Sequence, residues 1–367
     1  MRKLFILSWM QSLALPFFKL KSSHNPNTVR TPYDEAFDHL TFDVPKTALA
    51  ALKREPALPK FIRNEQLRQT KGVKWKWMKP NPAEKRAQSM RDDLHRQQSL
   101  RNIFGMVKCI DDNVGKLLKY LKSSGLDKNT IVIFSSDHGD TMGEHLLDDK
   151  KTPYETSAGV PMIIRFPSHI QPGRVVETAY STIDFAPTLL GIVGQVTGMF
   201  FDDTDNVFQG VDGSKEILNL GSPARKDDDV IFTYRYSKTS KSLWVAAITK
   251  RYKLILGVQD HPWFYDLEID PDELNNYYHD TKYQSIIDSM TKAVQTFLTQ
   301  QNIPDQHRIK FKGDGCRDSR NVLPYQEGER KFLCSDLLRK KEKVLNCLQE
   351  KVLQNCSQSC GKCNTIL

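Results

Sequence analysis

The sequence has no uninterrupted apolar stretch of about 18 residues, the length that suggests a transmembrane helix, so it offers no candidate membrane span. Cysteine is almost missing from its first 315 residues, where only Cys109 occurs. Apolar residues are not scarce: 39% of the chain is hydrophobic and 26% is charged, which excludes a disordered protein. Its 367 residues suffice for one large core and a smaller appended unit. We therefore expect a folded enzyme or binding protein.

Positive charge is concentrated in one segment. Residues 53–101 hold 14 Lys or Arg against 5 Asp or Glu, while the whole chain has a formal charge of +9. Such a segment would attract a polyanion, either nucleic acid or a sulfated glycan. We favour a solvated insertion, residues 34–100, whose charges have no specific partner, and we expect no nucleic acid ligand.

The remaining cysteines lie close together near the end of the chain. An even number of cysteines in a short segment is typical of a disulfide framework in an oxidising compartment. A zinc site is the competing interpretation, but no histidine lies among them. We expect a secreted or lumenal protein with a disulfide module over residues 316–363, whose pairing the sequence does not fix. The cysteines concerned are Cys316, Cys334, Cys347, Cys356, Cys360 and Cys363.

The pattern of apolar residues predicts helices and strands in alternation. A helical stripe covers residues 100–121 and ends at Gly125. A β-branched run at residues 130–134 predicts a fully buried strand of a parallel sheet. A second strand over residues 160–166 and a helix over residues 183–193 follow, which together indicate an α/β fold.

The sequence after residue 225 has a different pattern. Four β-rich segments and one long helical segment predict a small antiparallel sheet with a helix packed on it. We therefore divide the chain into an α/β domain at 1–225, an antiparallel subdomain at 226–300, a linker at 301–315 and the cysteine module. The segments are residues 230–234, 244–249, 252–258 and 263–267, with the helix at 283–300.

Polar residues follow the first predicted strand directly. Asp137 and His138 stand side by side there and Gly139 lets the chain turn. Carboxylate and imidazole groups suit a divalent cation, and functional groups collect at strand ends in α/β sheets. Alone, this short motif is weak evidence, and Asp140 and His145 are better explained as loop-stabilising residues.

A wider set of motifs resembles the sulfatase family of the alkaline phosphatase superfamily. The stretch 129–194 is similar to that family almost without a gap, and a weaker resemblance extends over residues 12–300. The motifs are residues 130–140, 143–145, 148–155, 160–161 and 184–190, followed by 209–213, 252–255, 265–268 and 270–276.

The resemblance implies roles for individual residues. Asp137 and His138 would bind calcium, and Lys150 would hold the sulfate and assist the leaving oxygen. A metal ion and an ammonium group both stabilise the negative oxygens of a sulfate ester under attack. His24 would be the catalytic histidine that contacts the substrate, although the family's usual histidine corresponds better to the position of Asn27. Either His24 substitutes for that histidine or proton delivery is impaired.

The sequence departs from the family at the nucleophile. Sulfatases attack with a formylglycine made from the cysteine of a Cys-x-Pro-Ser-Arg motif, and this motif and the paired metal-binding aspartates are absent. Cys109 lies in the predicted helix and so does not replace the cysteine of that motif. We therefore expect an α/β sheet that lacks its amino-terminal strands, a weak calcium site and no turnover by this polypeptide alone.

The function implied is hydrolysis of a sulfate ester of a carbohydrate or aryl compound. The alternative is a secreted pseudosulfatase that binds sulfated polysaccharide without cleaving it. A phosphomonoester or phosphodiester hydrolase of the same superfamily is a third possibility, which zinc in place of calcium would indicate. The cysteine module resembles the six-cysteine ShK toxin type. The oligomeric state is not indicated.

Overall fold

The structure is a computed structural model. It describes residues 28–53, 90, 92–147, 150–200, 208–235, 244–257 and 262–300, with the backbone of residues 326–327 and 330–331. His24, the six cysteines of the tail and residues 54–89 lie outside the described residues. Two-residue strands β7 (Gln326–Glu327) and β8 (Arg330–Lys331) pair within the tail.

The first sheet of the described residues has two strands. β1 (Val132–Ser135) pairs with β2 (Met162–Arg165), with Ile133 opposite Ile164. The two strands are antiparallel, so the expectation of a parallel arrangement is wrong for this pair. A short apolar run indicates a strand but carries no signal for the direction of its neighbour.

Neither face of this sheet is fully buried, since Ile133 on the face of Ile164 is itself 38% exposed. One face packs through Ile164 on Ile192 of helix α6 (Phe185–Thr197), in a cluster that also contains Phe166. The other face presents Phe134 and Ile163, which are 38% and 59% exposed. The expectation of a fully buried strand is therefore wrong as well.

Helix α4 (Leu94–Ser123) contains the predicted helical stripe and begins earlier than expected. Asp93 is its N-cap, because its side chain accepts hydrogen bonds from the backbone N–H groups of His95 and Arg96. The buried side chains of its first half pack against Phe42 and Met142. A further helix, α1 (Lys46–Lys53), lies inside the stretch expected to be irregular, so residues 34–100 are not all irregular.

The second sheet confirms the predicted antiparallel sheet with a helix packed on it. Its four strands are paired in chain order, β3-β4-β5-β6, and all neighbours are antiparallel. Helix α8 (Gln284–Gln300) packs on it, with Ile287, Met290 and Val294 buried against Leu254 and Phe264. The strands are β3 (Ile231–Arg235), β4 (Trp244–Ile248), β5 (Tyr252–Gly257) and β6 (Trp263–Asp266).

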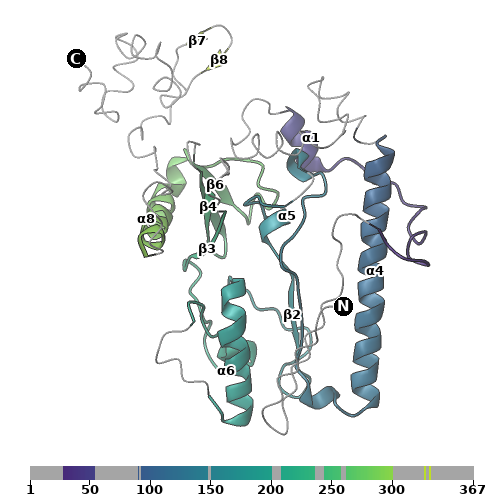
Figure 1. Cartoon of the computed structure of the whole chain (residues 1–367). Coiled ribbons are helices and arrows are strands. Elements are labelled where there is room, and N and C mark those ends of the chain that lie inside the picture. Colours follow the sequence, from purple (N-terminus) through teal and green to yellow (C-terminus); the bar gives the residue numbers. More distant parts are fainter. Residues whose placement is uncertain are drawn as a thin grey trace.

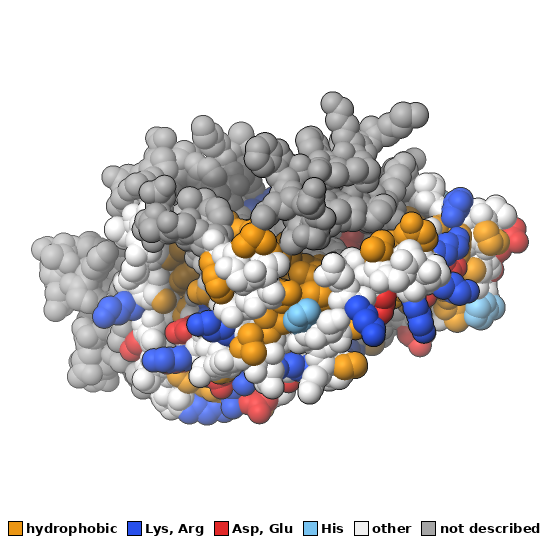
Figure 2. Space-filling model, turned by 90° about the horizontal axis from the view of Figure 1, so that it is seen from below, with side chains coloured by type: hydrophobic (Ala, Val, Ile, Leu, Met, Phe, Trp, Pro, Cys, Tyr) orange, Lys and Arg blue, Asp and Glu red, His pale blue; other side chains and the backbone are white. Residues whose placement is uncertain are grey.

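The β1–β2 pair and the β3–β6 sheet are separate sheets. Figure 1 shows the β3–β6 sheet beside α8, with the short helix α5 (Glu155–Ala158) between this sheet and β2. Seen from below in Figure 2, apolar side chains are exposed in several groups among charged ones. Across the described ranges, none of the helices is both long and apolar enough to span a membrane.

The remaining helical segments are short. They are α7 (Ser214–Ile217) and the 3₁₀ turns η2 (Asp127–Asn129), η3 (Glu144–Leu146), η4 (Thr182–Asp184) and η5 (Thr281–Tyr283).

Candidate functional site

The loop after β1 presents Asp137 and His138. Asp137 Oδ1 accepts a hydrogen bond from the backbone N–H of His138 at 3.1 Å, and Ser136 Oγ donates to the carbonyl of His138 at 2.9 Å. Gly139 N–H donates to the carbonyl of Ser157 at 2.9 Å. A Cβ on Gly139 would lie 2.1 Å from the carbonyl oxygen of Thr156, so only glycine fits this close approach.

The next loop, residues 141–151, has an unusual backbone. Among its described residues, four other than glycine have positive φ: Met142 (47°), His145 (51°), Leu146 (61°) and Lys151 (78°). Residues other than glycine rarely adopt this conformation, and such residues cluster at functional sites, where the surrounding structure holds them in place. The loop is therefore a candidate site on backbone geometry alone.

The side chain of His145 is part of the loop's packing. It is buried, and its ring stacks on Tyr154 with centroids 3.7 Å apart and an angle of 6° between the planes. Tyr154 in turn contacts Tyr265 of β6, with ring centroids 6.3 Å apart. The expectation that His145 stabilises the loop agrees with this stacking.

A cavity of about 650 Å³ brings the predicted site residues together. Asp137 and His138 from the loop after β1 line it, and so does Lys150 from the following loop. The structure thus gathers three of the four residues expected to act on a ligand, and their roles remain predictions. The fourth, His24, lies outside the described residues.

The opposite wall of the cavity comes from the second sheet, and the sequence analysis missed it. Phe232, Tyr234 and Arg235 of β3 and Trp244 of β4 line this wall. Arg235 and Trp244 lie opposite each other on one face of this sheet, whereas the rings of Phe232 and Tyr234 lie on the other face, against α8. Period-2 alternation separates the two faces in the sequence. It does not reveal that the face of Arg235 and Trp244 meets the loop of Lys150, because that depends on how the sheet packs against this loop.

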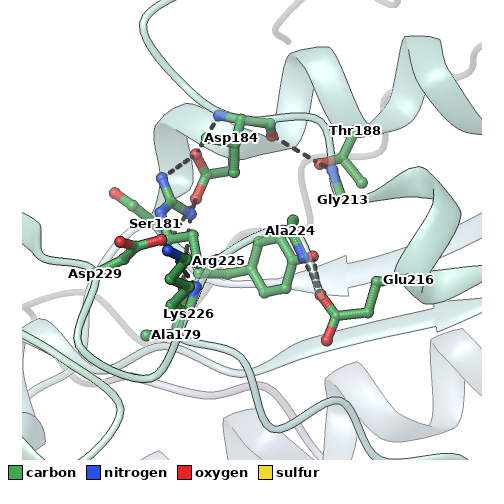
Figure 3. Close-up of polar contacts among 12 residues, drawn as sticks. Ala179, Ser181, Asp184, Thr188, Gly213, Glu216, Ala224, Arg225, Lys226 and Asp229 are labelled. Carbon is green, nitrogen blue, oxygen red and sulfur yellow. Dashed lines mark hydrogen bonds and ion pairs between the residues drawn. The ribbon is translucent and has the colours of Figure 1, made fainter. Parts of the chain in front are cut away.

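The segment 179–182 lines the cavity near β3 and is held by buried charges. Asp184, fully buried, accepts two hydrogen bonds from Arg225, at 2.6 and 2.9 Å, and others from the N–H groups of Ser181 and Val211 at 2.8 Å. Figure 3 shows Arg225 directed at Asp184 from the neighbouring loop. This pair fixes the start of α6 relative to the cavity wall.

Glu216 supports the same segment through Tyr180. Burial opposes ionisation of Glu216, but hydrogen bonds from Thr178, the Ala224 N–H and Tyr180 outweigh it and lower the pKa of this carboxyl. Burial and the bond to Glu216 raise the pKa of the Tyr180 hydroxyl above its usual range. Tyr180 therefore stays neutral at physiological pH and acts as a hydrogen-bond donor.

A second buried network joins the loop to the second sheet. Lys253 of β5 is 0% exposed, and its Nζ lies 2.7 Å from Glu273 Oε1, 2.6 Å from Glu155 Oε1 and 2.9 Å from the carbonyl oxygen of Pro153. The other oxygen of Glu273 accepts the Glu155 N–H at 2.7 Å. Burial raises the pKa of the Glu273 carboxyl, and the charge of Lys253 opposes this.

The residues at the cavity offer only part of a calcium site. Calcium takes about 6–8 oxygen ligands, whereas Asp137 supplies one carboxylate and His138 supplies an imidazole, which calcium seldom uses. Among the residues that the structure describes, no group of three or more Asp, Glu, His or Cys side chains is placed to hold a metal ion. The described donors therefore do not fit calcium by themselves.

Comparison with solved structures identifies the fold. A protein solved in complex with its substrate D-glucosamine-2-N,6-O-disulfate matches 78% of this chain and 65% of that chain, with a TM-score of 0.56 at 24% identity. A candidate sulfatase from Bacteroides fragilis matches 77% of this chain and 52% of that chain, with a TM-score of 0.53 at 26% identity. The chain therefore shares its fold with these two proteins.

Sequence comparison finds similarity to sulfatases. Residues 16–195 match the family described as Sulfatase, and residues 143–300 match that described as N-sulphoglucosamine sulphohydrolase, C-terminal. Together the two matches cover residues 16–300 with models of sulfatases. The predicted resemblance to this family is confirmed, whereas the ShK-like character of the tail is not.

Curated relatives agree with the family. An endo-4-O-sulfatase from Bacteroides thetaiotaomicron is 32% identical in an alignment of 231 residues that covers 58% of this chain and 44% of the relative. An N-acetylglucosamine-6-O-sulfatase from the same organism is 30% identical in an alignment of 226 residues that covers 59% of this chain and 39% of the relative. The chain thus spans less than half the length of these two relatives.

Proposed function

We propose that the cavity of Asp137, His138 and Lys150 binds the sulfate ester of a carbohydrate, as part of a sulfuric ester hydrolase. The observation that carries this proposal is the convergence of these three residues on one cavity from two loops. A Lys ammonium presents three hydrogen-bond donors and a full charge, which suit the oxygens of a sulfate group.

The size and lining of the cavity favour a sugar as the rest of the ligand. Small-molecule sites have volumes of about 300–1,000 Å³, and 650 Å³ exceeds what a sulfate ion alone fills. Arg235, which lies opposite Trp244 on the β3–β4 face at the cavity, offers a further cation. The names of the relatives, two of which are sulfatases of sulfated sugars, support the same substrate class.

Lys150 would act on the charge of the ester. Its ammonium group would neutralise sulfate oxygens in the bound state and the leaving oxygen as the ester bond breaks. The sequence has no Cys-x-Pro-Ser-Arg motif, so we propose that this polypeptide alone binds the ester and does not cleave it.

The alternative is a secreted protein that only binds sulfated polysaccharide. The missing nucleophile motif favours it. We propose a secreted or lumenal location on the basis of the six clustered cysteines, which would form three disulfide bridges in an ShK-like module. Mass spectrometry of non-reduced peptides tests the bridges, and free thiols at all six positions would refute this location.

Calorimetric titration with D-glucosamine-2-N,6-O-disulfate tests the proposed site. Unsulfated glucosamine is the ligand control, and Lys119→Ala, at an exposed lysine of α4, is the protein control. We expect Lys150→Ala to weaken binding about 10-fold or more, because a charge-assisted hydrogen bond is lost. Equal affinity for the two sugars, or no effect of Lys150→Ala, would refute the proposal.

Sulfate release, measured with the same sugar, separates the two functions. We expect no release by this polypeptide. Steady release that Lys150→Ala abolishes would refute the absence of turnover and would require a nucleophile other than formylglycine from the usual motif.

A further inference from the structure

The backbone beside Lys150 is held by two side chains of the second sheet. The carbonyl oxygen of Lys151 accepts a hydrogen bond from Trp244 Nε1 at 3.2 Å and one from Arg235 Nη1 at 3.4 Å. Arg235 and Trp244 are directly opposite each other in the β3–β4 register. One cross-strand pair therefore holds one carbonyl group.

A third donor holds the same segment two residues further on. The Lys253 ammonium, which is fully buried, donates to the carbonyl of Pro153 at 2.9 Å. Its position is fixed in turn by the buried carboxylate of Glu273 at 2.7 Å. Residues 151–153 are thus attached to β3, β4 and β5 through side-chain donors.

Two of these hydrogen bonds act at Lys151, where the backbone conformation is unfavourable. Lys151 has φ of 78°, a conformation that non-glycine residues adopt only when their surroundings impose it. If its carbonyl lost these donors, the chain at Lys151 would relax toward an ordinary conformation. That relaxation would turn the adjoining peptide of Lys150 and move its side chain away from Asp137 and His138.

We propose that Trp244 and Arg235 are positioning residues, which set the affinity of the cavity for sulfate by fixing the backbone at Lys151 and thereby the side chain of Lys150. This inference rests on the proposed function, in which Lys150 binds the sulfate. The indole N–H acts through the Lys151 carbonyl and not on the ligand. The second sheet then determines both the shape of the cavity wall and the place of its principal cation.

A double-mutant cycle tests the coupling. Trp244→Phe removes the N–H and keeps an aromatic ring, while Trp263→Phe is the matched control on β6. Both tryptophans pack in the same apolar cluster, but Trp263 Nε1 has no hydrogen-bond partner among the described residues. The probe is D-glucosamine-2-N,6-O-disulfate, titrated by calorimetry into each single variant and into both variants combined with Lys150→Ala.

Positioning predicts a specific pattern. Trp244→Phe weakens binding about 5-fold when Lys150 is present and has no further effect in the Lys150→Ala background, since coupled sites are not additive. Trp263→Phe leaves the affinity for the sugar unchanged both with Lys150 present and in the Lys150→Ala background. A loss of equal size in both backgrounds would overturn the proposal, because it would show that Trp244 contacts the ligand directly or only supports the fold.

Limited trypsin digestion tests the positioning without any ligand. Cleavage after Lys150 or Lys151 requires local opening of this segment. We expect Trp244→Phe to speed this cleavage several-fold relative to the wild type and to Trp263→Phe, with unchanged unfolding in urea. Failure of the wild type to bind the sugar would refute the proposed function, while equal cleavage rates in all three proteins would overturn the positioning itself.

Discussion

The Arg225 guanidinium and the Asp184 carboxylate form a paired set of hydrogen bonds, at 2.6 and 2.9 Å, beneath the wall of the cavity. Asp184 is fully buried and the side chain of Arg225 is 10% exposed. Because both charges are withdrawn from water, each depends on the other for solvation. The pair joins the start of α6 to the loop of Arg225 and so fixes the neighbouring Ser181.

Removal of Arg225 is expected to destabilise the protein strongly. Arg225→Met leaves the Asp184 carboxylate buried without its cation, which costs about 3–5 kcal/mol of the free energy of unfolding. The control is Lys250→Met, which breaks the exposed pair with Asp227 and has little effect. Urea denaturation measures both, and similar losses in the two variants would contradict this view of the buried pair.

The Lys253–Glu273 pair allows a test by double substitution. Lys253→Met is expected to cost about 3–5 kcal/mol, because Glu273 remains buried without its cation. Lys253→Met combined with Glu273→Leu is expected to recover most of that loss, since an apolar pair of similar volume has no charge to solvate. A double variant that is less stable than Lys253→Met would show that Glu273 is needed mainly to hold the Glu155 N–H.

The lowered pKa of Glu216 predicts a dependence of stability on pH. Its folded-state pKa lies below the unfolded value, so its contribution is complete above about pH 4.3 and is lost as the pH falls through the folded-state pKa. Glu216→Gln is therefore expected to be less stable at pH 7 and to lose less stability on acidification. The control is Glu35→Gln, at an exposed position.

Urea midpoints at several pH values between about 3 and 7 measure this effect. The buried carboxyl of Asp266 has a lowered pKa too, because hydrogen bonds from Arg251 and Tyr283 outweigh its burial. Some acid sensitivity therefore persists in Glu216→Gln. If the urea midpoint of Glu216→Gln fell with pH as steeply as that of the wild type, the contribution assigned to Glu216 would be contradicted.

Calcium is expected to bind weakly to this polypeptide. Two neighbouring donors, Asp137 and His138, satisfy little of the coordination shell of the ion, so we expect a Kd of about 1 mM or weaker. Asp137→Asn should abolish the binding, and Asp228→Asn, at an exposed aspartate, should not change it. Calorimetry measures this, and micromolar affinity would show that further ligands complete the site.

The sequence predicted the second sheet well because its signals are local. Each of β3 to β6 is a short run of β-branched or aromatic residues, and α8 has a clear helical stripe that buries Ile287 and Val294. The pairing of β1 with β2 was predicted wrongly, because strand direction depends on the path of the chain between residues 136 and 161. No local pattern encodes that path.

Only part of the site was predicted, because only some of its residues belong to a local motif. Asp137, His138 and Lys150 belong to motifs that resemble a known family, and the structure places them at one cavity. Arg235 and Trp244 carry no motif, and their place beside the Lys151 carbonyl follows from the packing of two sheets far apart in the sequence. The positive φ of Lys151 was not predictable either, because lysine seldom adopts it.

A crystal structure of the protein with D-glucosamine-2-N,6-O-disulfate tests the central claim most directly. We expect one sulfate group within hydrogen-bond distance of Lys150 Nζ, beside Asp137 and His138, with the sugar ring against the wall formed by β3 and β4. An empty cavity at a saturating concentration of the sugar, or a sugar bound at another surface, would contradict the account.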